Sequence, residues 1–92
     1  MVYDIIFSDE AKLDIKHSRD YYVKVSSNLL LKFDIEMIET VDFLGVHPQN
    51  FQKRYRKIKI VFFKKFPFGI HYIFENKTIY IQRVLHQKRL YN

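Results

Sequence analysis

The 92-residue sequence is long enough for one small domain with a single core and too short for two. It contains no cysteine, which excludes disulfides and thiolate zinc sites. A membrane-spanning helix needs about 20 consecutive apolar residues, and no apolar run in the chain is close to that length. The N-terminus has neither the basic start nor the small-residue cleavage site of a signal peptide, so we expect a cytoplasmic protein.

The net charge of +6 is divided unevenly along the chain. Residues 1–52 contain five Lys/Arg and nine Asp/Glu, whereas residues 53–92 contain eleven and one, so the two parts carry −4 and +10. Strands usually mix both signs on an open face, because like charges on neighbouring strands repel each other. The segregation therefore favours an anionic partner (nucleic acid, an acidic protein segment or a membrane surface) over a merely solvated basic face.

The N-terminal part predicts a strand followed by a helical hairpin. Val2–Phe7 is β-branched and aromatic, which is typical of a strand, here at a sheet edge. Ser8 is an N-cap for a first helix, which shows apolar spacings of three and four residues. The polar residues 26–28 separate it from a second helix, which ends near Gly45 and Pro48. This second helix is apolar over a wide arc, so it either lies between the sheet and the first helix, which we prefer, or leaves a surface for a partner.

The C-terminal part predicts three antiparallel strands after a loop at residues 49–53. Apolar and polar residues alternate through residues 57–62, and further strands are expected at Phe68–Phe74, after Pro67, and at Thr78–His86. On the last strand Arg83 either ends an apolar face or is displaced by a bulge. The fold class is thus α+β in one domain of residues 1–92: an N-terminal strand, a helical hairpin and a three-stranded antiparallel sheet.

The order of four segments resembles a known family. An early helix with SDEAKLDI and YY, a strand RYRKIKI, a strand KKFPFGIHYIF and the terminus IQRVLHQKR are together similar to toxins of the RelE/ParE superfamily from bacterial type II toxin-antitoxin systems. The resemblance covers essentially the whole chain, although each motif is short. It implies a RelE/ParE-like fold and a growth-arresting toxin, whereas composition and periodicity indicate only the α+β sandwich and its basic part.

The resemblance implies one of two mechanisms. RelE-like members cleave mRNA inside the ribosome, which needs a proton acceptor near the ribose 2′-OH, a proton donor and cations around the phosphate. Under that reading the catalytic candidates are Arg83, His86 and Tyr91. ParE-like members instead poison DNA gyrase. Under either mechanism the residues expected to bind nucleic acid or a partner are basic: Arg54, Arg56, Lys57, Lys59, Lys88 and Arg89.

Two features of the sequence favour gyrase poisoning over RNA cleavage. The nuclease branch usually carries an arginine directly after the aromatic residue that opens the central strand, and this chain has Gly69 there. The terminal VLHQKR is also more similar to the ParE branch. We therefore place gyrase poisoning first and mRNA cleavage second.

Several alternatives accompany this reading. A metal site at His71 and His86 is disfavoured because neither Cys nor a pair of carboxylates accompanies the histidines, and His71 is expected to be a hydrogen-bonded strand residue. A non-catalytic basic RNA-binding module is the alternative outside the toxin class; Tyr80 would then stack on bases. If the chain is a toxin, its partner is a cognate acidic antitoxin, for which Arg83, His86 and Arg89 are further contact candidates, and its target is DNA gyrase or ribosome-bound mRNA. We expect no small-molecule cofactor and no membrane association.

Overall fold

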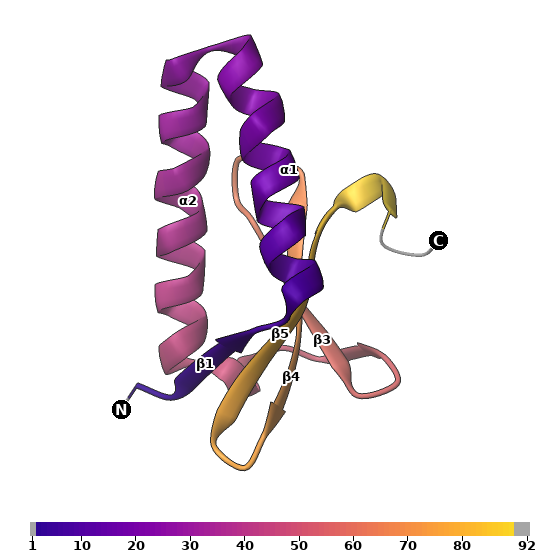
Figure 1. The fold of residues 1–92 in the computed structure, drawn as a ribbon. Coiled ribbons are helices and arrows are strands. Elements are labelled where there is room, and N and C mark those ends of the chain that lie inside the picture. Colours follow the sequence, from indigo (N-terminus) through magenta and orange to yellow (C-terminus); the bar gives the residue numbers. More distant parts are fainter. Residues whose placement is uncertain (1, 90–92) are drawn as a thin grey trace.

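The computed structural model describes residues 2–89, and of Arg89 only the backbone. A helical hairpin packs against one face of a sheet, so the domain has two layers (Figure 1). The elements in chain order are β1 (Asp4–Phe7), α1 (Asp9–Val25), α2 (Ser27–Val46), β2 (Lys53–Tyr55), β3 (Ile58–Phe62), β4 (Phe68–Glu75) and β5 (Thr78–His86), with short 3₁₀ turns at Pro48–Asn50 and Gln87–Arg89.

The sheet is mixed and its strand order is β1-β5-β4-β3-β2. The first strand lies at an edge, as predicted, where it pairs parallel to β5, and all other pairs are antiparallel. The expectation that RYRKIKI and the alternation through residue 62 belong to one strand was wrong. The backbone turns between β2 and β3, where Arg56 adopts a positive φ of 51°. The sheet therefore has five strands, and the predicted loop ends where β2 begins.

Serine side chains begin both helices, as the sequence predicted for the first. The Ser8 hydroxyl accepts the N–H of Ala11 at 3.0 Å and donates to the Gln82 carbonyl at 2.7 Å, so the cap also fixes α1 to β5. Ser26 accepts the Leu29 N–H at 2.9 Å at the start of α2. An N-cap satisfies a backbone donor that lacks a partner within the helix, which typically stabilises by about 1 kcal/mol.

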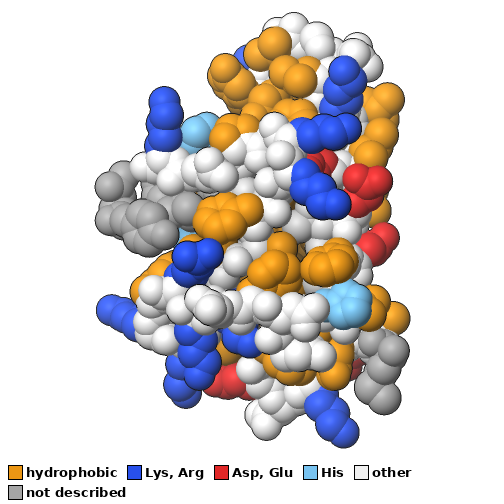
Figure 2. Space-filling view, turned by 180° about the vertical axis from the view of Figure 1, so that it is seen from behind, with side chains coloured by type: hydrophobic (Ala, Val, Ile, Leu, Met, Phe, Trp, Pro, Cys, Tyr) orange, Lys and Arg blue, Asp and Glu red, His pale blue; other side chains and the backbone are white. Residues whose placement is uncertain are grey.

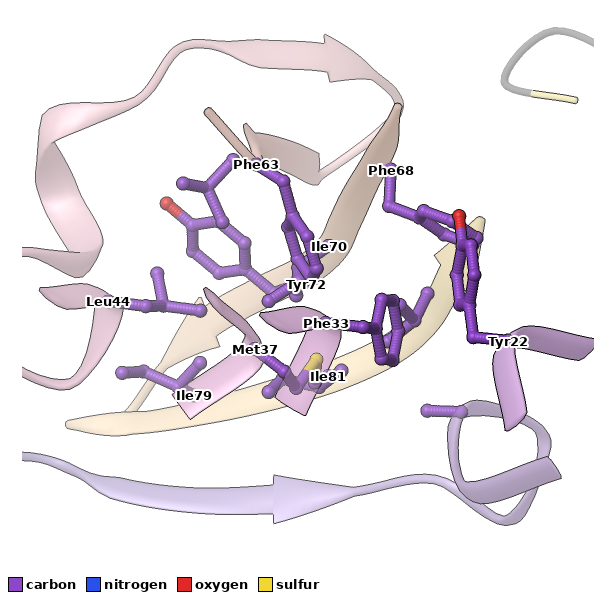
Figure 3. Close-up of a cluster of buried hydrophobic side chains, with 13 residues drawn as sticks. Tyr22, Phe33, Met37, Leu44, Phe63, Phe68, Ile70, Tyr72, Ile79 and Ile81 are labelled. Atoms are coloured by element: carbon purple, nitrogen blue, oxygen red, sulfur yellow. The ribbon is translucent and has the colours of Figure 1, made fainter. Parts of the chain in front are cut away.

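The core lies between the helices and the sheet and is mainly aromatic at one end. Figure 3 shows Phe33 of α2 among Tyr22 and Phe68, with ring centroids 5.2 Å and 5.5 Å from its own. At the other end Tyr72 is fully buried, and its hydroxyl donates to the Pro48 carbonyl at 2.7 Å. Buried aromatic rings supply much of the apolar area of so small a core, and Phe33 is the residue around which the rings of its aromatic end pack.

The preferred position of α2, between sheet and first helix, was wrong. Both helices contact the sheet, and α2 leaves Leu31, Ile35 and Ile38 exposed by 57 %, 47 % and 61 %. These residues recur at spacings of four and three and therefore share one helix face. The alternative reading of a partly open apolar face is the one that the structure bears out.

The β4–β5 pair contains a bulge, which decides the position of Arg83. His71 lies opposite Arg83 and Tyr72 opposite Ile81, so Gln82 is the extra residue on β5. The bulge lets Ile81 and Val84 both point into the core, where they are buried, although they are three residues apart. Arg83 is thereby displaced from the apolar face, as one of the two sequence readings expected.

A buried carboxylate on α2 holds the loop between β3 and β4. Glu36 is only 7 % exposed, and its two oxygens accept the backbone N–H groups of Lys64, Lys65 and Phe66 at 2.6 to 3.1 Å. Successive N–H groups that converge on one anion form a favourable electrostatic pocket. The conformation of this loop, which contains no glycine, is therefore fixed by hydrogen bonds to Glu36.

Candidate functional site: the basic sheet face

Four of the six predicted basic residues, Arg54, Arg56, Lys57 and Lys59, lie on the β2–β3 hairpin. Arg54 is exposed on β2 and its guanidinium stands 5.8 Å from the centre of the Phe62 ring. Arg56 and Lys57 form the turn, and Lys57 makes an exposed ion pair of 3.5 Å with Glu75. Lys59 is partly buried on β3. Figure 2 shows Lys and Arg side chains spread over this side of the molecule with hydrophobic side chains between them.

Tyr55 and His71 form a polar pair on this face of the sheet, although nothing in the sequence indicated that they lie together. The Tyr55 hydroxyl is 2.6 Å from Nδ1 of His71, which is fully buried on β4. His71 Nε2 is buried without a hydrogen-bond partner among residues 2–89. The expectation of a hydrogen-bonded strand residue is therefore met at one ring nitrogen only.

Burial keeps this pair uncharged near neutral pH. It lowers the pKa of His71, an effect that the positive charge of Arg83 reinforces and Asp14 opposes. Burial also raises the pKa of Tyr55, against the influence of Arg83 and Arg56. A neutral His71 accepts the Tyr55 proton at Nδ1 when its own proton is on Nε2. Tyr55 and His71 therefore form a neutral hydrogen-bonded pair, and the charges of Arg83 and Arg56 are close enough to affect it electrostatically.

Arg83, a candidate catalytic cation, is paired with a carboxylate of α1. Its Nε and Nη2 donate to the two oxygens of Asp14 at 2.7 and 3.0 Å, and the same carboxylate accepts the Val84 N–H at 3.0 Å. The Asp14 side chain is 13 % exposed and that of Arg83 46 %. A bidentate pair of this kind is directional and joins α1 to β5 next to the bulge. Much of the positive charge of Arg83 is thereby compensated.

His86, the candidate acid or base, does not share a face with Arg83. The register from residues 83 to 86 is regular, and side chains three apart on a strand point to opposite faces. The His86 ring packs 5.4 Å from that of Phe68, and its Nδ1 accepts the Lys88 N–H at 3.2 Å. Lys88 is exposed. Of the other predicted residues, Tyr91 lies outside the described residues and Arg89 is described only in its backbone.

Gly69 lies on the same face of β4 as His71 and is closely packed there. A Cβ at this position would stand 2.9 Å from Cγ2 of Ile60 and 3.3 Å from the Phe62 ring. Contacts below 3.0 Å require a neighbour to move. The site that carries an arginine in the nuclease branch therefore has no room for a side chain here.

Neither a metal centre nor a membrane span is seen in the part of the chain that is described. Residues 2–89 contain no group of three or more His, Asp or Glu side chains arranged to hold a metal ion. No helix among them is long and apolar enough to cross a bilayer.

Sequence reasoning missed Tyr55 and Asp14 as parts of the site and gave His71 only a structural role. Asp14 is 69 residues from Arg83, and Tyr55 is 16 residues from His71, so no local spacing joins them. Alternation through RYRKIKI as a single strand would have placed Tyr55 on the sheet face opposite to His71, and only the turn between β2 and β3, where Tyr55 lies opposite Ile58, brings the two side chains together.

The fold matches the solved structure of the chromosomal ParDE toxin-antitoxin system from P. aeruginosa, with a TM-score of 0.79 and 20 % identity over 92 % of this chain and 96 % of that one. It also matches the RelBE2 toxin-antitoxin complex from Mycobacterium tuberculosis, with a TM-score of 0.60 and 17 % identity over 94 % and 99 %. The fold is therefore that of the RelE/ParE toxins.

Residues 5–91 match the family described as the ParE toxin of the type II toxin-antitoxin system parDE. The chain belongs to this ParE toxin family, as the sequence resemblance implied. No curated protein matches the sequence.

Proposed function

We propose that this toxin arrests bacterial growth in the cytoplasm by poisoning DNA gyrase and that a cognate acidic antitoxin neutralises it. The observation that carries the choice of target is the separation of Arg83 and His86, two of the three residues that the sequence offered as candidates for RNA cleavage. Arg83 is bound to Asp14, and His86 points to the opposite face of the sheet. An acid and base must lie within hydrogen-bonding reach of one reacting group, directly or through one water.

The packing at Gly69 supports the same choice. Stabilisation of a pentacoordinate phosphate needs cations fixed around it, and the position that supplies one in the nuclease branch is closed by Ile60 and Phe62. A toxin that acts by binding to a protein target does not need that group.

The charge distribution supports an acidic antitoxin. The chain from residue 53 onward has a charge of +10, and Arg54, Arg56 and Lys57 are exposed around one hairpin. Complementary charge on a partner accelerates association and disfavours other partners. We expect R54E/R56E to weaken antitoxin binding, whereas K16E, on α1, should leave it unchanged. Equal binding of both variants would contradict an antitoxin site on the hairpin.

The target is tested in one culture after induction without antitoxin. We expect plasmid DNA to become relaxed or cleaved within minutes while messenger RNA stays intact. New 5′ ends inside translated codons with normal supercoiling would contradict the proposal. Co-expression of the adjacent reading frame should restore growth, and a failure to do so would reject its product as the antitoxin.

A second candidate function, RNA cleavage, is favoured by one observation. Tyr55 is 36 % exposed, and its hydroxyl contacts the neutral His71 in the electrostatic field of two arginines. This pair could transfer a proton to or from a bound phosphodiester. Tyr55→Phe keeps the ring and removes the hydroxyl, so it should abolish toxicity if RNA is cleaved here and leave it intact if gyrase is the target.

A further inference from the structure

The outer face of α2 is apolar, and no part of the described chain covers it. Leu31, Ile35 and Ile38 are exposed, whereas Phe33 and Met37 of the same helix are buried in the core. In Figure 1, α1 lies along one flank of α2, and the opposite flank is open. Apolar side chains at spacings of four and three residues form a single stripe on a helix. We call the three exposed residues the α2 stripe, which faces away from the core.

The α2 stripe has the pattern of a short coiled-coil seam. Asn28 precedes Leu31 by three residues and Asp42 follows Ile38 by four, so the spacings along this face are three, four, three and four. The same alternation separates the a and d positions through which two helices of a coiled coil pack. The central positions are apolar and both ends are polar. A second helix with the same pattern therefore matches this face.

Two opposite charges lie beside the α2 stripe, on the flank away from α1. Lys32 and Glu39 are seven residues apart, which is nearly two helical turns, so they share one flank of the helix. Asp34, which binds Arg19 of α1, lies on the other flank. Lys32 and Glu39 are exposed, and neither forms a salt bridge within residues 2–89.

Neither of these charges has a suitable partner in its own chain. The residue four positions after Lys32 is Glu36, whose carboxylate is bound by the β3–β4 loop. The residues three positions before and after Glu39 are Glu36 and Asp42, which are also acidic. Lys64 lines a groove together with Glu39, but the two form no salt bridge in the described part of the chain. Lys32 and Glu39 are therefore available to a partner.

A second copy of the chain supplies the complementary charges. When two α2 helices pack antiparallel about a two-fold axis beside Ile35, residues equally far before and after that point come to the same level. Lys32 of each copy then lies level with Glu39 of the other, and the axis keeps both residues on one flank of the helix pair. A parallel pair would instead bring Lys32 level with Lys32 and Glu39 level with Glu39. The charges thus favour the antiparallel arrangement.

We propose that two copies of the toxin associate through the α2 stripe, with their α2 helices antiparallel and with Lys32 of each copy paired with Glu39 of the other. This association goes beyond the proposed function, since neither gyrase nor the antitoxin takes part in it. The stripe and its two charges include no residue of the β2–β3 hairpin, so both copies keep that hairpin available.

The size of the contact predicts a weak dimer. The 20 residues of α2 form a helix about 30 Å long, and a contact about 10 Å wide along it covers about 300 Å² of each copy. Stable interfaces cover about 800 Å² of each partner. We therefore expect a dissociation constant of about 10 to 100 µM.

Sedimentation velocity of the purified toxin without antitoxin measures this association, at concentrations from about 1 to about 500 µM. The variants are K32E, E39K and K32E/E39K, and circular dichroism establishes that each is folded. K32E and E39K should each raise the dissociation constant about fivefold to thirtyfold, because each places like charges together twice in the dimer. K32E/E39K exchanges the two charges and should restore the dissociation constant to within about threefold of the unaltered protein. The control K77E, in the exposed β4–β5 turn, should also stay within about threefold.

Ile35→Glu tests the apolar part of the face. It should abolish the dimer, because it places two carboxylates beside the two-fold axis in a contact that is otherwise apolar. A toxin that stays monomeric up to about 500 µM, a dimer that survives Ile35→Glu, or a K32E/E39K variant no better than its single variants would overturn the proposal. A monomeric toxin that loses antitoxin binding in Ile35→Glu would overturn it as well, since the antitoxin would then be the occupant of this face.

Discussion

Removal of the Glu36 carboxylate should be among the most damaging single changes on the helices. In Glu36→Ala three successive N–H groups, those of Lys64, Lys65 and Phe66, lose their shared acceptor. A hydrogen bond to a charged group is worth about 1.5 to 3 kcal/mol when it is buried. Lys64 and Lys65 are exposed and regain water when the loop moves, so we take about 1 kcal/mol for each N–H and about 3 kcal/mol in all.

For a domain of this size, that loss corresponds to a decrease in melting temperature of about 12 to 24 °C. Glu36→Gln keeps the shape and one acceptor oxygen but brings an NH₂ group toward N–H donors, so we expect it to lose about 2 kcal/mol. Urea unfolding followed by circular dichroism measures these free energies. Glu39→Ala, one turn further along α2 and exposed, is the matched control and should stay within about 0.5 kcal/mol of the unaltered protein. If Glu36→Ala also stays within about 1 kcal/mol, the loop does not depend on this carboxylate.

The remaining predictions concern the sheet face. Asp14→Ala should lower the free energy of unfolding by about 2 kcal/mol, more than Arg83→Ala does, because it leaves both the guanidinium and the Val84 N–H without their acceptor. Equal free energies of unfolding for the two variants in urea would contradict this order. Gly69→Ala should destabilise by about 1 to 3 kcal/mol through its 2.9 Å contact with Ile60, and an unchanged melting temperature would show that the strands separate easily. Because burial lowers the pKa of His71 in the folded state, the unfolded chain binds the proton more readily, and stability is lost as the pH falls below about 6.5, by at most about 1.4 kcal/mol per unit. Unfolding at about pH 8 and about pH 5.5 should show this loss in the unaltered protein and a smaller one in His71→Gln, and identical losses would exclude His71 as the cause.

The features that could be predicted from the sequence are those with local causes. Ser8 and the polar residues 26–28 marked the helix boundaries because capping involves residues three apart or fewer. Asn76 adopts a φ of 51° in the β4–β5 turn, a conformation that asparagine takes more readily than most residues. The β2–β3 turn escaped prediction because Arg56, a residue that seldom adopts positive φ, occupies it with no Gly or Asn nearby.

The features that could not be predicted depend on distant partners. Glu36 appeared to be an ordinary helix residue, and its role depends on a loop 28 to 30 residues further along the chain. From the sequence, Arg83 was expected to be a cation available for catalysis. Its partner Asp14 is 69 residues away, so the ion pair could not be foreseen. The bulge at Gln82 had been one of two open readings, and only the pairing of His71 with Arg83 and of Tyr72 with Ile81 decides between them.

The most direct test of the central claim, that the target is DNA gyrase, is an assay with purified gyrase, relaxed plasmid and the purified toxin. The account predicts that the toxin inhibits supercoiling, that cleaved plasmid accumulates, and that Tyr55→Phe does so equally well. Unimpaired supercoiling at a large molar excess of folded toxin, together with cleavage of messenger RNA on translating ribosomes, would contradict it.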